Sequence, residues 1–175
     1  NRYLEINPLS EIFKFKKKFN IIVLASKADL KKKLSPNINF QTFLTKEKIK
    51  FFLVRNNNEI YVILKKIFNK NKNSIILSVG SSFIFEKKII SDFKNRLFNY
   101  HLGYLPFERG GAASSWALMS ARKQTALTIH RISNGIDKGA IIVQNKIALN
   151  KNISLKNYYK KVREKEKDFF NTFFK

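Results

Sequence analysis

Apolar residues recur along this chain at two spacings, one typical of helices and the other typical of strands. The clearest helical spacing covers residues 60–68, where apolar side chains recur at steps of three and four and form one stripe. A longer helix is predicted at the C-terminus, behind a Ser154 cap. Its apolar side is formed by Leu155, Tyr158, Val162, Phe169 and Phe173.

Short apolar runs between the helices predict buried strands. The predicted strands cover residues 21–24, 49–54, 74–79, 96–100, 126–132 and 140–149. Shorter helices are predicted at residues 9–13, 86–93 and 110–120, and a Lys-rich turn region follows the first strand. Strands that alternate with helical segments predict an α/β domain with a largely parallel sheet flanked by helices. Ligands of such sheets gather beyond the carboxyl ends of the strands.

The composition narrows the chemistry that this domain can carry. No cysteine is present, which excludes a disulfide scaffold and a thiol nucleophile, and the two histidines leave little for a metal centre. No uncharged apolar run reaches the roughly 18 residues of a membrane span, and no leader segment is visible. We therefore expect a cytoplasmic protein with no membrane partner and no metal.

The formal net charge is +23, from 35 basic and 12 acidic residues, which predicts attraction to polyanions. The Lys residues are scattered among all segments, however, and the chain is rich in the amino acids of A/T-rich codons. A coding bias spread over the surface is therefore favoured over a dedicated polyanion groove.

Two segments concentrate polar side chains in positions suited to chemistry. Asn99 and His101 lie two residues apart at the end of a predicted strand, hence on the same side of it. Asp137 lies in a loop bracketed by Gly135 and Gly139, where backbone can approach a ligand closely.

These residues form a pattern that resembles the folate-dependent formyltransferase family. The pattern is Asn-x-His at 99–101 followed by Leu-Pro and Arg-Gly, then Thr-Ile-His at 128–130, and finally Ile-Asp-x-Gly-x-Ile-Ile-x-Gln at 136–144. The separation of His101 from Asp137 matches the family's spacing, and the resemblance covers residues 75–147 well. It implies a Rossmann-like formyltransferase domain that transfers a formyl group from 10-formyltetrahydrofolate to an amine.

The resemblance also implies roles for three catalytic residues. Formyl transfer passes through a tetrahedral oxyanion, to which the amide of Asn99 would donate a hydrogen bond. His101 would take the proton of the attacking amine, and Asp137 would orient His101 or a water. His130 lies in the middle of a strand, so a structural role is favoured for it over a functional one.

Binding residues follow from the same resemblance. The folate contacts are expected at Ser81, Phe83, Ile84, Ser133, Gly135 and Asp137. The acceptor contacts are expected at Tyr104, Pro106, Arg109 and Trp116. Gly103 is a departure, because the family more often has Ser there. Trp116 has two interpretations of equal weight, a stacking surface for a sugar or base and a residue that packs its helix on the sheet.

Three acceptors and one non-enzymatic function compete. A Trp in this region resembles the enzymes that formylate nucleotide-linked amino-deoxysugars, such as dTDP-4-amino-4,6-dideoxyglucose, for surface polysaccharides like lipopolysaccharide O-antigen. Methionyl-tRNA is the second acceptor, with nucleic acid a partner only in that case, and glycinamide ribonucleotide is the third. A basic RNA-binding protein is the alternative of another class. Since many relatives dimerise, a homodimer is also expected.

The expected organisation is one catalytic domain over residues 1–150, with residues 151–175 forming a helix that packs on it. A complete family member opens with a strand and a turn before its first helix, whereas this chain enters at Tyr3, Leu4, Glu5 and Ile6 and continues into the helix. The first strand of the sheet is therefore expected to be missing.

Overall fold

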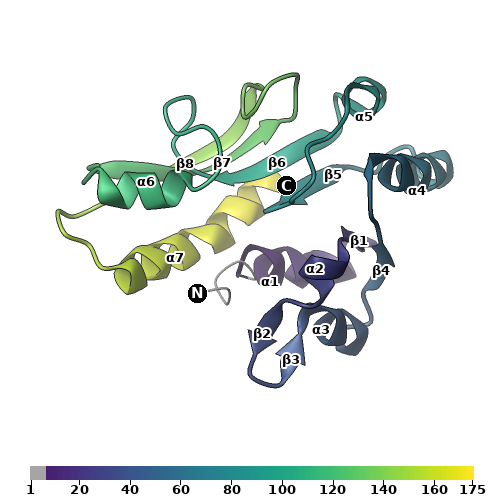
Figure 1. The fold of residues 1–175 in the computed structure, drawn as a ribbon, viewed down its shortest axis with the longest axis horizontal. Helices are drawn as coiled ribbons and strands as arrows, with labels where there is room; N and C mark the ends of the chain where they lie inside the picture. The colour runs from purple at the N-terminus through teal and green to yellow at the C-terminus, as the bar shows by residue number, and fades with distance from the viewer. Residues whose placement is uncertain (1–6) are drawn as a thin grey trace. The chain divides into compact units, whose positions relative to one another are not determined.

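The computed structural model describes residues 7–175 of the chain. These residues form two compact units, one that ends at Ser74 and one that begins at Ile75 (Figure 1). Residues 3–6, where the sequence analysis places the entry into the first helix, lie outside the described residues. The assignment of residues 1–150 and 151–175 to one domain stays a prediction.

The described part of the first unit, residues 7–74, contains nine elements. They are α1 (Asn7–Phe13), the 3-10 helix η2 (Lys14–Lys17), β1 (Ile22–Ala25), α2 (Lys27–Leu30), β2 (Lys33–Ser35), β3 (Ile38–Asn39), α3 (Phe40–Lys46), β4 (Lys50–Leu53) and α4 (Asn57–Lys70). Strands β1 and β4 pair in parallel, and β2 and β3 pair antiparallel. The parallel pair is the one that the apolar runs at 21–24 and 49–54 predicted.

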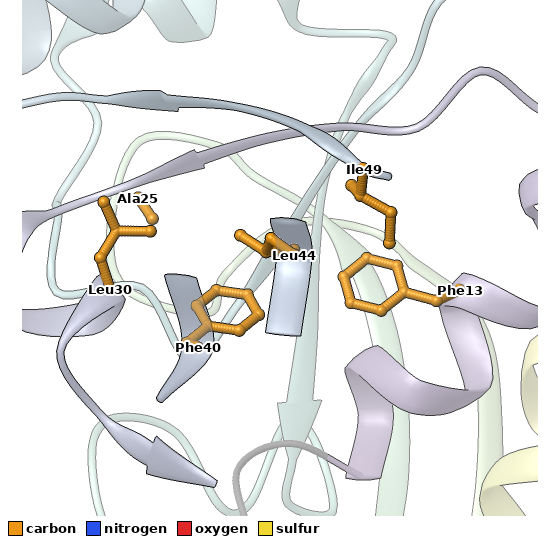
Figure 2. Packing of buried hydrophobic residues seen from close by; sticks show 6 residues of the cluster. All are labelled: Phe13, Ala25, Leu30, Phe40, Leu44 and Ile49. Atoms are coloured by element: carbon orange, nitrogen blue, oxygen red, sulfur yellow. The ribbon is translucent and has the colours of Figure 1, made fainter. Parts of the chain in front are cut away.

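Six buried apolar residues hold this unit together, as Figure 2 shows: Phe13, Ala25, Leu30, Phe40, Leu44 and Ile49. They come from α1, β1, α2, α3 and the residue before β4, so the cluster joins helices to the parallel strand pair. Leu44 has no exposed surface at all. Burial of such side chains contributes about 1.5–3 kcal/mol each to folding.

The Lys-rich region after β1 is more ordered than the predicted turn. Ser26 caps α2 through its side chain, which accepts from the backbone N–H of Asp29, and the Asp29 carboxylate accepts from the backbone N–H of Ser26. This reciprocal capping box satisfies two donors at the helix start. This cap spans only three residues, so no apolar period in the sequence predicts α2.

The second unit is built on a four-stranded sheet with the order β5-β6-β7-β8. Its elements are β5 (Ile76–Val79), α5 (Lys87–Phe93), β6 (Leu97–Leu102), α6 (Ala113–Met119), β7 (Gln124–Arg131), β8 (Ile141–Ala148) and α7 (Leu155–Phe173). Strands β5 and β6 are parallel, whereas β7 is antiparallel to both β6 and β8. The parallel pairs and flanking helices confirm the predicted α/β fold class, and the C-terminal strands add an antiparallel part.

Helix α7 covers one face of this sheet (Figure 1). Phe98 and Tyr100 of β6 pack on it, with ring centroids 5.5 Å from Phe173 and 5.3 Å from Phe170, respectively. Ser154 caps the helix as predicted by accepting from the backbone N–H of Asn157.

The apolar side of α7 differs in part from the prediction. Tyr158, Val162 and Phe169 are buried as expected, and Phe170 and Glu166 are buried with them, but Leu155 is 48% exposed. Leu155 is the first residue of the helix. Its predicted place on the packed side is therefore wrong.

Candidate active site

The alternation of side chains along β6 separates the helix-packed face from the candidate site. Phe98 and Tyr100 point to α7, so Asn99 and His101 belong to the opposite face. The register with β7 places His130 directly across from Asn99 and Thr128 directly across from His101. Four polar side chains of two neighbouring strands therefore share one face of the sheet.

Asp137 reaches this face from the loop between β7 and β8. Its backbone is left-handed, with φ at +51°, and Gly135 before it has φ at +96°. At Gly139 an added Cβ would lie 1.7 Å from the carbonyl oxygen of Arg131, so only glycine fits the close return of this loop to β7. The backbone N–H of Gly110 donates to Asp137 Oδ2 at 2.8 Å and holds the carboxylate in place.

The side chains expected to be catalytic converge on the Asp137 carboxylate. Asn99 Nδ2 lies 3.4 Å from Asp137 Oδ1, and His101 Nδ1 lies 3.6 Å from Asp137 Oδ2. The second distance is too long for a good hydrogen bond, but it places a carboxylate where it would stabilise a protonated imidazole. The structure thus brings all three predicted residues together.

His130 joins this group, although the sequence favoured a structural role for it. Its Nε2 lies 3.2 Å from Asn99 Nδ2 and 3.2 Å from Asp137 Oδ1, and its side chain is 2% exposed. Its Nδ1 faces the carbonyl oxygen of Arg131 at 2.8 Å, so Nδ1 carries a hydrogen. A neutral His130 then accepts from Asn99, whereas a protonated one donates to Asp137. The sequence signal for it is the Thr-Ile-His element of the family resemblance at 128–130, whereas its register opposite Asn99 comes only from the structure.

The predicted acceptor residues lie on or beside the loop that follows β6. The rings of Tyr104 and Phe107 are tilted against each other, with 5.3 Å between centroids, and Lys146 Nζ lies 4.9 Å from the centre of the Tyr104 ring. Pro106 and Arg109 are exposed. Tyr104, Pro106 and Arg109 make none of the hydrogen bonds or ion pairs that join Asn99, His101 and His130 to Asp137.

Trp116 is 62% exposed on α6, whose buried side is formed by Ala113 and Ala117. The alternative that Trp116 packs its helix on the sheet is therefore wrong.

The predicted folate contacts lie in two loops. Ser81, Phe83 and Ile84 follow β5, where Ser81 Oγ accepts from the backbone N–H of Phe83, and Ile84 is 77% exposed. Ser133 and Gly135 precede Asp137 in the other loop. A cavity of about 460 Å³ is lined on one side by this second loop, at Ile132, Ser133, Asn134, Gly139 and Ala140. The rest of its lining comes from α5, the segment between α5 and β6, and the end of β7, and includes the basic side chains of Lys87, Lys94 and Arg131.

The described residues offer neither a metal cluster nor a membrane helix. Within residues 7–175, no group of three or more His, Asp and Glu side chains is arranged to hold a metal ion. No helix in the same range is long and apolar enough to cross a bilayer.

Solved structures with the same fold are known. Phosphoribosylglycinamide formyltransferase from Streptococcus pneumoniae superposes with a TM-score of 0.73 over 96% of this chain and 94% of that chain, at 16% identity. A formyltetrahydrofolate deformylase from Pseudomonas syringae superposes with a TM-score of 0.71 over 95% of this chain and 56% of that one, at 14% identity. At identities this low, the two superpositions show a shared Rossmann-like α/β fold and carry no argument about activity.

Sequence similarity establishes the family. Residues 16–173 match the family described as formyl transferase, and the chain belongs to it. It is 28% identical to methionyl-tRNA formyltransferase of Finegoldia magna over 66% of this chain and 36% of the relative. It is 33% identical to the bifunctional polymyxin resistance protein ArnA of Wigglesworthia glossinidia brevipalpis over 67% of this chain and 18% of the relative. The chain thus spans well under half the length of these two relatives.

Proposed function

We propose that this chain transfers a formyl group from 10-formyltetrahydrofolate to the amino group of a nucleotide-linked amino-deoxysugar. The observation that carries the proposal is the convergence of Asn99, His101 and His130 on the Asp137 carboxylate. An amide donor beside a proton-accepting imidazole suits acyl transfer, and family membership agrees with this chemistry.

The proposed reaction proceeds in two steps. The acceptor amine attacks the formyl carbon and forms a new C–N bond, which leaves a negative charge on the former carbonyl oxygen. Asn99 Nδ2 donates to that oxygen with the hydrogen that otherwise faces Asp137 Oδ1 at 3.4 Å, and His101 takes the proton that the amine loses, with Asp137 stabilising the imidazolium. The carbonyl then re-forms, the bond from the formyl carbon to N10 of the folate breaks, and His101 returns the proton to N10 to give tetrahydrofolate.

The donor would bind near the loop that carries Asp137. The cavity beside Ser133 and Asn134 combines apolar side chains such as Ile90 and Ile132 with the basic Lys87, Lys94 and Arg131. An apolar cleft with a basic rim suits an aromatic ligand that carries carboxylates, as a folate does.

One observation supports the sugar acceptor. Trp116 offers an exposed aromatic face of the kind that stacks on sugars and bases. A homodimer and a cytoplasmic location are further parts of this proposal.

Methionyl-tRNA is the second candidate acceptor, favoured by two other observations. Several relatives are methionyl-tRNA formyltransferases, and a net charge of +23 would favour binding to an RNA backbone. The two acceptors share the same donor chemistry, so the choice between them leaves the roles of Asn99, His101 and Asp137 unchanged.

An acceptor screen tests the proposal. The purified chain is supplied with 10-formyltetrahydrofolate and either dTDP-4-amino-4,6-dideoxyglucose or methionyl-tRNA, and tetrahydrofolate is measured. We expect turnover with the aminosugar, and a loss of about 100-fold or more in Asn99→Ala and His101→Ala. Turnover with methionyl-tRNA alone would contradict the aminosugar and identify methionyl-tRNA as the acceptor. Formate release without an acceptor would indicate a deformylase, and RNA binding without turnover would indicate the non-enzymatic alternative.

A further inference from the structure

A buried carboxylate, Glu108, lies in the loop between β6 and α6, next to the candidate site. Its side chain is 3% exposed. Glu108 Oε2 accepts from the backbone N–H of Tyr104 at 2.6 Å and from the Thr125 hydroxyl at 2.8 Å. Arg122 Nε lies 3.6 Å from Oε1, an ion pair that is too long for a hydrogen bond. Burial of a charged group is unfavourable unless it is bonded, so the two hydrogen bonds to Oε2 are what hold Glu108 in place.

The same contacts fix the turn that contains Glu108. The backbone N–H of Glu108 donates to the carbonyl oxygen of Tyr104 at 2.9 Å, while the Glu108 side chain accepts from the N–H of Tyr104. Residues 104 and 108 are therefore tied to each other twice, and Thr125 ties the turn to β7. The position of the Glu108 main chain depends on its own side chain.

The main-chain carbonyl of Glu108 is the hydrogen-bond partner of the His101 imidazole. His101 Nε2 lies within hydrogen-bonding distance of that oxygen. A carbonyl oxygen only accepts, so Nε2 carries the hydrogen and donates it. His101 Nδ1, on the side of Asp137, is then the nitrogen whose protonation can change.

Gly103 makes this contact sterically feasible. A Cβ at residue 103 would lie 2.5 Å from His101 Nε2 and 2.9 Å from the Glu108 carbonyl oxygen. Real side chains essentially never approach so closely, so any residue larger than glycine would push the imidazole or the turn away. Gly103, the residue at which this chain departs from the family pattern, thus lies beside the contact between His101 Nε2 and the Glu108 carbonyl oxygen.

We propose that Glu108 is a positioning residue for His101. Its carboxylate holds the 104–108 turn so that its own carbonyl fixes the Nε2–H tautomer, in the space that Gly103 leaves open. His101 Nδ1 is thereby left beside Asp137 as the nitrogen that exchanges the proton. The consequence for catalysis rests on the proposed function, whereas the tautomer can be measured without any activity.

Imidazole ¹⁵N NMR at pH 8 tests the tautomer directly, because the chain has only two histidines. We expect Nε2–H for His101, and Nδ1–H for His130, which faces the Arg131 carbonyl through Nδ1. Glu108→Ala and Gly103→Ala should each shift the His101 nitrogens toward a mixture of tautomers and leave His130 unchanged. Glu108→Gln, which keeps an acceptor for Tyr104 and Thr125, should restore the wild-type spectrum.

Glu166→Ala is the matched control. Glu166 is an equally buried carboxylate, and it accepts from the Tyr100 hydroxyl at 2.7 Å on the helix-packed side of β6. Its removal should leave the His101 tautomer unchanged. An Nδ1–H tautomer of His101 in the wild type would overturn the proposal, as would unchanged His101 signals in both Glu108→Ala and Gly103→Ala. If Glu108→Ala does not fold, Gly103→Ala decides the question.

Kinetics with the formyl acceptor give a second readout. Glu108→Ala should lower kcat by about 10- to 100-fold with KM for the folate within about twofold, since misplacing a reacting group affects the chemical step more than binding. Glu108→Gln should recover most of the loss. Equal losses in Glu108→Ala and Glu166→Ala would show a general effect of stability and overturn the proposal. A wild-type chain without turnover would refute the proposed function alone, because the NMR result stands independently.

Discussion

Asp137 adopts a left-handed backbone, φ +51°, that residues other than Gly, Asn and Asp seldom take. Such a conformation costs of order 1–3 kcal/mol and persists only where the surroundings determine it. Here the N–H of Gly110 and the close return of Gly139 hold it, and both hydrogen-bonding sides of the carboxylate face Asn99, His101 and His130. The strain lies at the residue on which the site converges.

Asp137→Asn tests the charge separately from the backbone. Asn tolerates the left-handed region and keeps an oxygen for the N–H of Gly110, so we expect a thermal midpoint within a few degrees of wild type. The loss of the charge should lower kcat by about 100-fold or more, because nothing then stabilises the His101 imidazolium. Stopped assays of tetrahydrofolate formation measure this. A variant that keeps more than half of the wild-type kcat would contradict the proposed role.

His130→Ala tests whether the second histidine is functional. Removing it leaves Asn99 without one partner in a half-buried position, so we expect a loss of about 1–3 kcal/mol in the free energy of unfolding. If His130 also orients Asn99 for the oxyanion, kcat should fall by about tenfold or more at temperatures where the variant is folded. Unfolding in urea and steady-state kinetics separate the effects. Full activity in a folded but less stable variant would restore the structural role that the sequence favoured.

At the scale of elements, short polar signals determine α2. Burial opposes ionisation of Asp29, but the hydrogen bond from Ser26 and the interaction with Lys32 outweigh it, and the pKa of Asp29 is lowered below its ordinary value of 3.8. A lowered pKa means that the charged form stabilises the fold. This contribution is complete above pH 3.8 and is lost as the pH falls below that value through the folded pKa.

Ser26→Ala should destabilise the chain by about 1 kcal/mol at pH 6, the usual cost of a lost helix cap. The difference from wild type should shrink in part as the pH approaches 3, because the Ser26 hydroxyl also donates to Asp29 Oδ2 at 2.6 Å and this bond loses its charged acceptor when the carboxylate is protonated. Urea unfolding at pH 6 and pH 3 gives the comparison. A difference that stays constant between these values would contradict the role of the Asp29 charge, whereas the bond from the backbone N–H of Asp29 to Ser26 Oγ is independent of pH.

The buried tyrosines at helix α7, Tyr100 and Tyr158, give the stability of the fold the opposite pH dependence. Burial, together with the negative charge of Glu166, raises the pKa of the Tyr100 hydroxyl well above its ordinary value of 10.0. Burial likewise raises the pKa of Tyr158. A raised pKa means that the protonated form stabilises the fold, so the contribution is complete below pH 10.0 and is lost as the pH rises above it.

Tyr100→Phe removes the hydroxyl that donates to Glu166. We expect a loss of about 1–3 kcal/mol at pH 7, since the buried carboxylate loses a hydrogen bond. The loss of stability above pH 10.0 should also become shallower, and one late-titrating tyrosine should disappear from the absorbance titration. An unchanged alkaline titration would show that Tyr100 is not the residue responsible.

At the scale of the whole molecule, the net charge of +23 separates the two acceptors by salt dependence. Binding of tRNA through several phosphates weakens steeply with salt, whereas a nucleotide sugar carries only a diphosphate. Raising the salt from about 50 to 200 mM should therefore raise KM for methionyl-tRNA by at least tenfold and KM for the aminosugar much less. Equal sensitivity of both acceptors would contradict this prediction.

His101→Ala is the control for non-specific RNA binding. Because Lys residues occur in all segments, RNA affinity and its salt slope should be the same in this variant as in wild type. A variant that loses RNA binding would place the RNA at the site, in conflict with binding through scattered charge.

Much of the fold was accessible from the apolar spacing alone. The strands β1, β4, β5, β6, β7 and β8 and the helices α4, α5, α6 and α7 all lie within a few residues of their predicted ranges. Each of these elements buries one side or one continuous run of its side chains, so its apolar residues recur at a regular spacing in the sequence. Helices α2 and α3 and the short pair β2–β3 were not predicted, because these short elements have too few apolar residues for an apolar period to repeat.

The sequence by itself determined which residue types are available for chemistry and that Asn99 and His101 share a side of one strand, because alternation along a strand is a local property. Only the tertiary structure decided that His130 lies opposite Asn99 and that Trp116 is exposed. It also decided that Glu108 turns its carbonyl to His101. These facts depend on strand register and loop closure between residues far apart in the chain, and such contacts leave no periodic trace in the sequence.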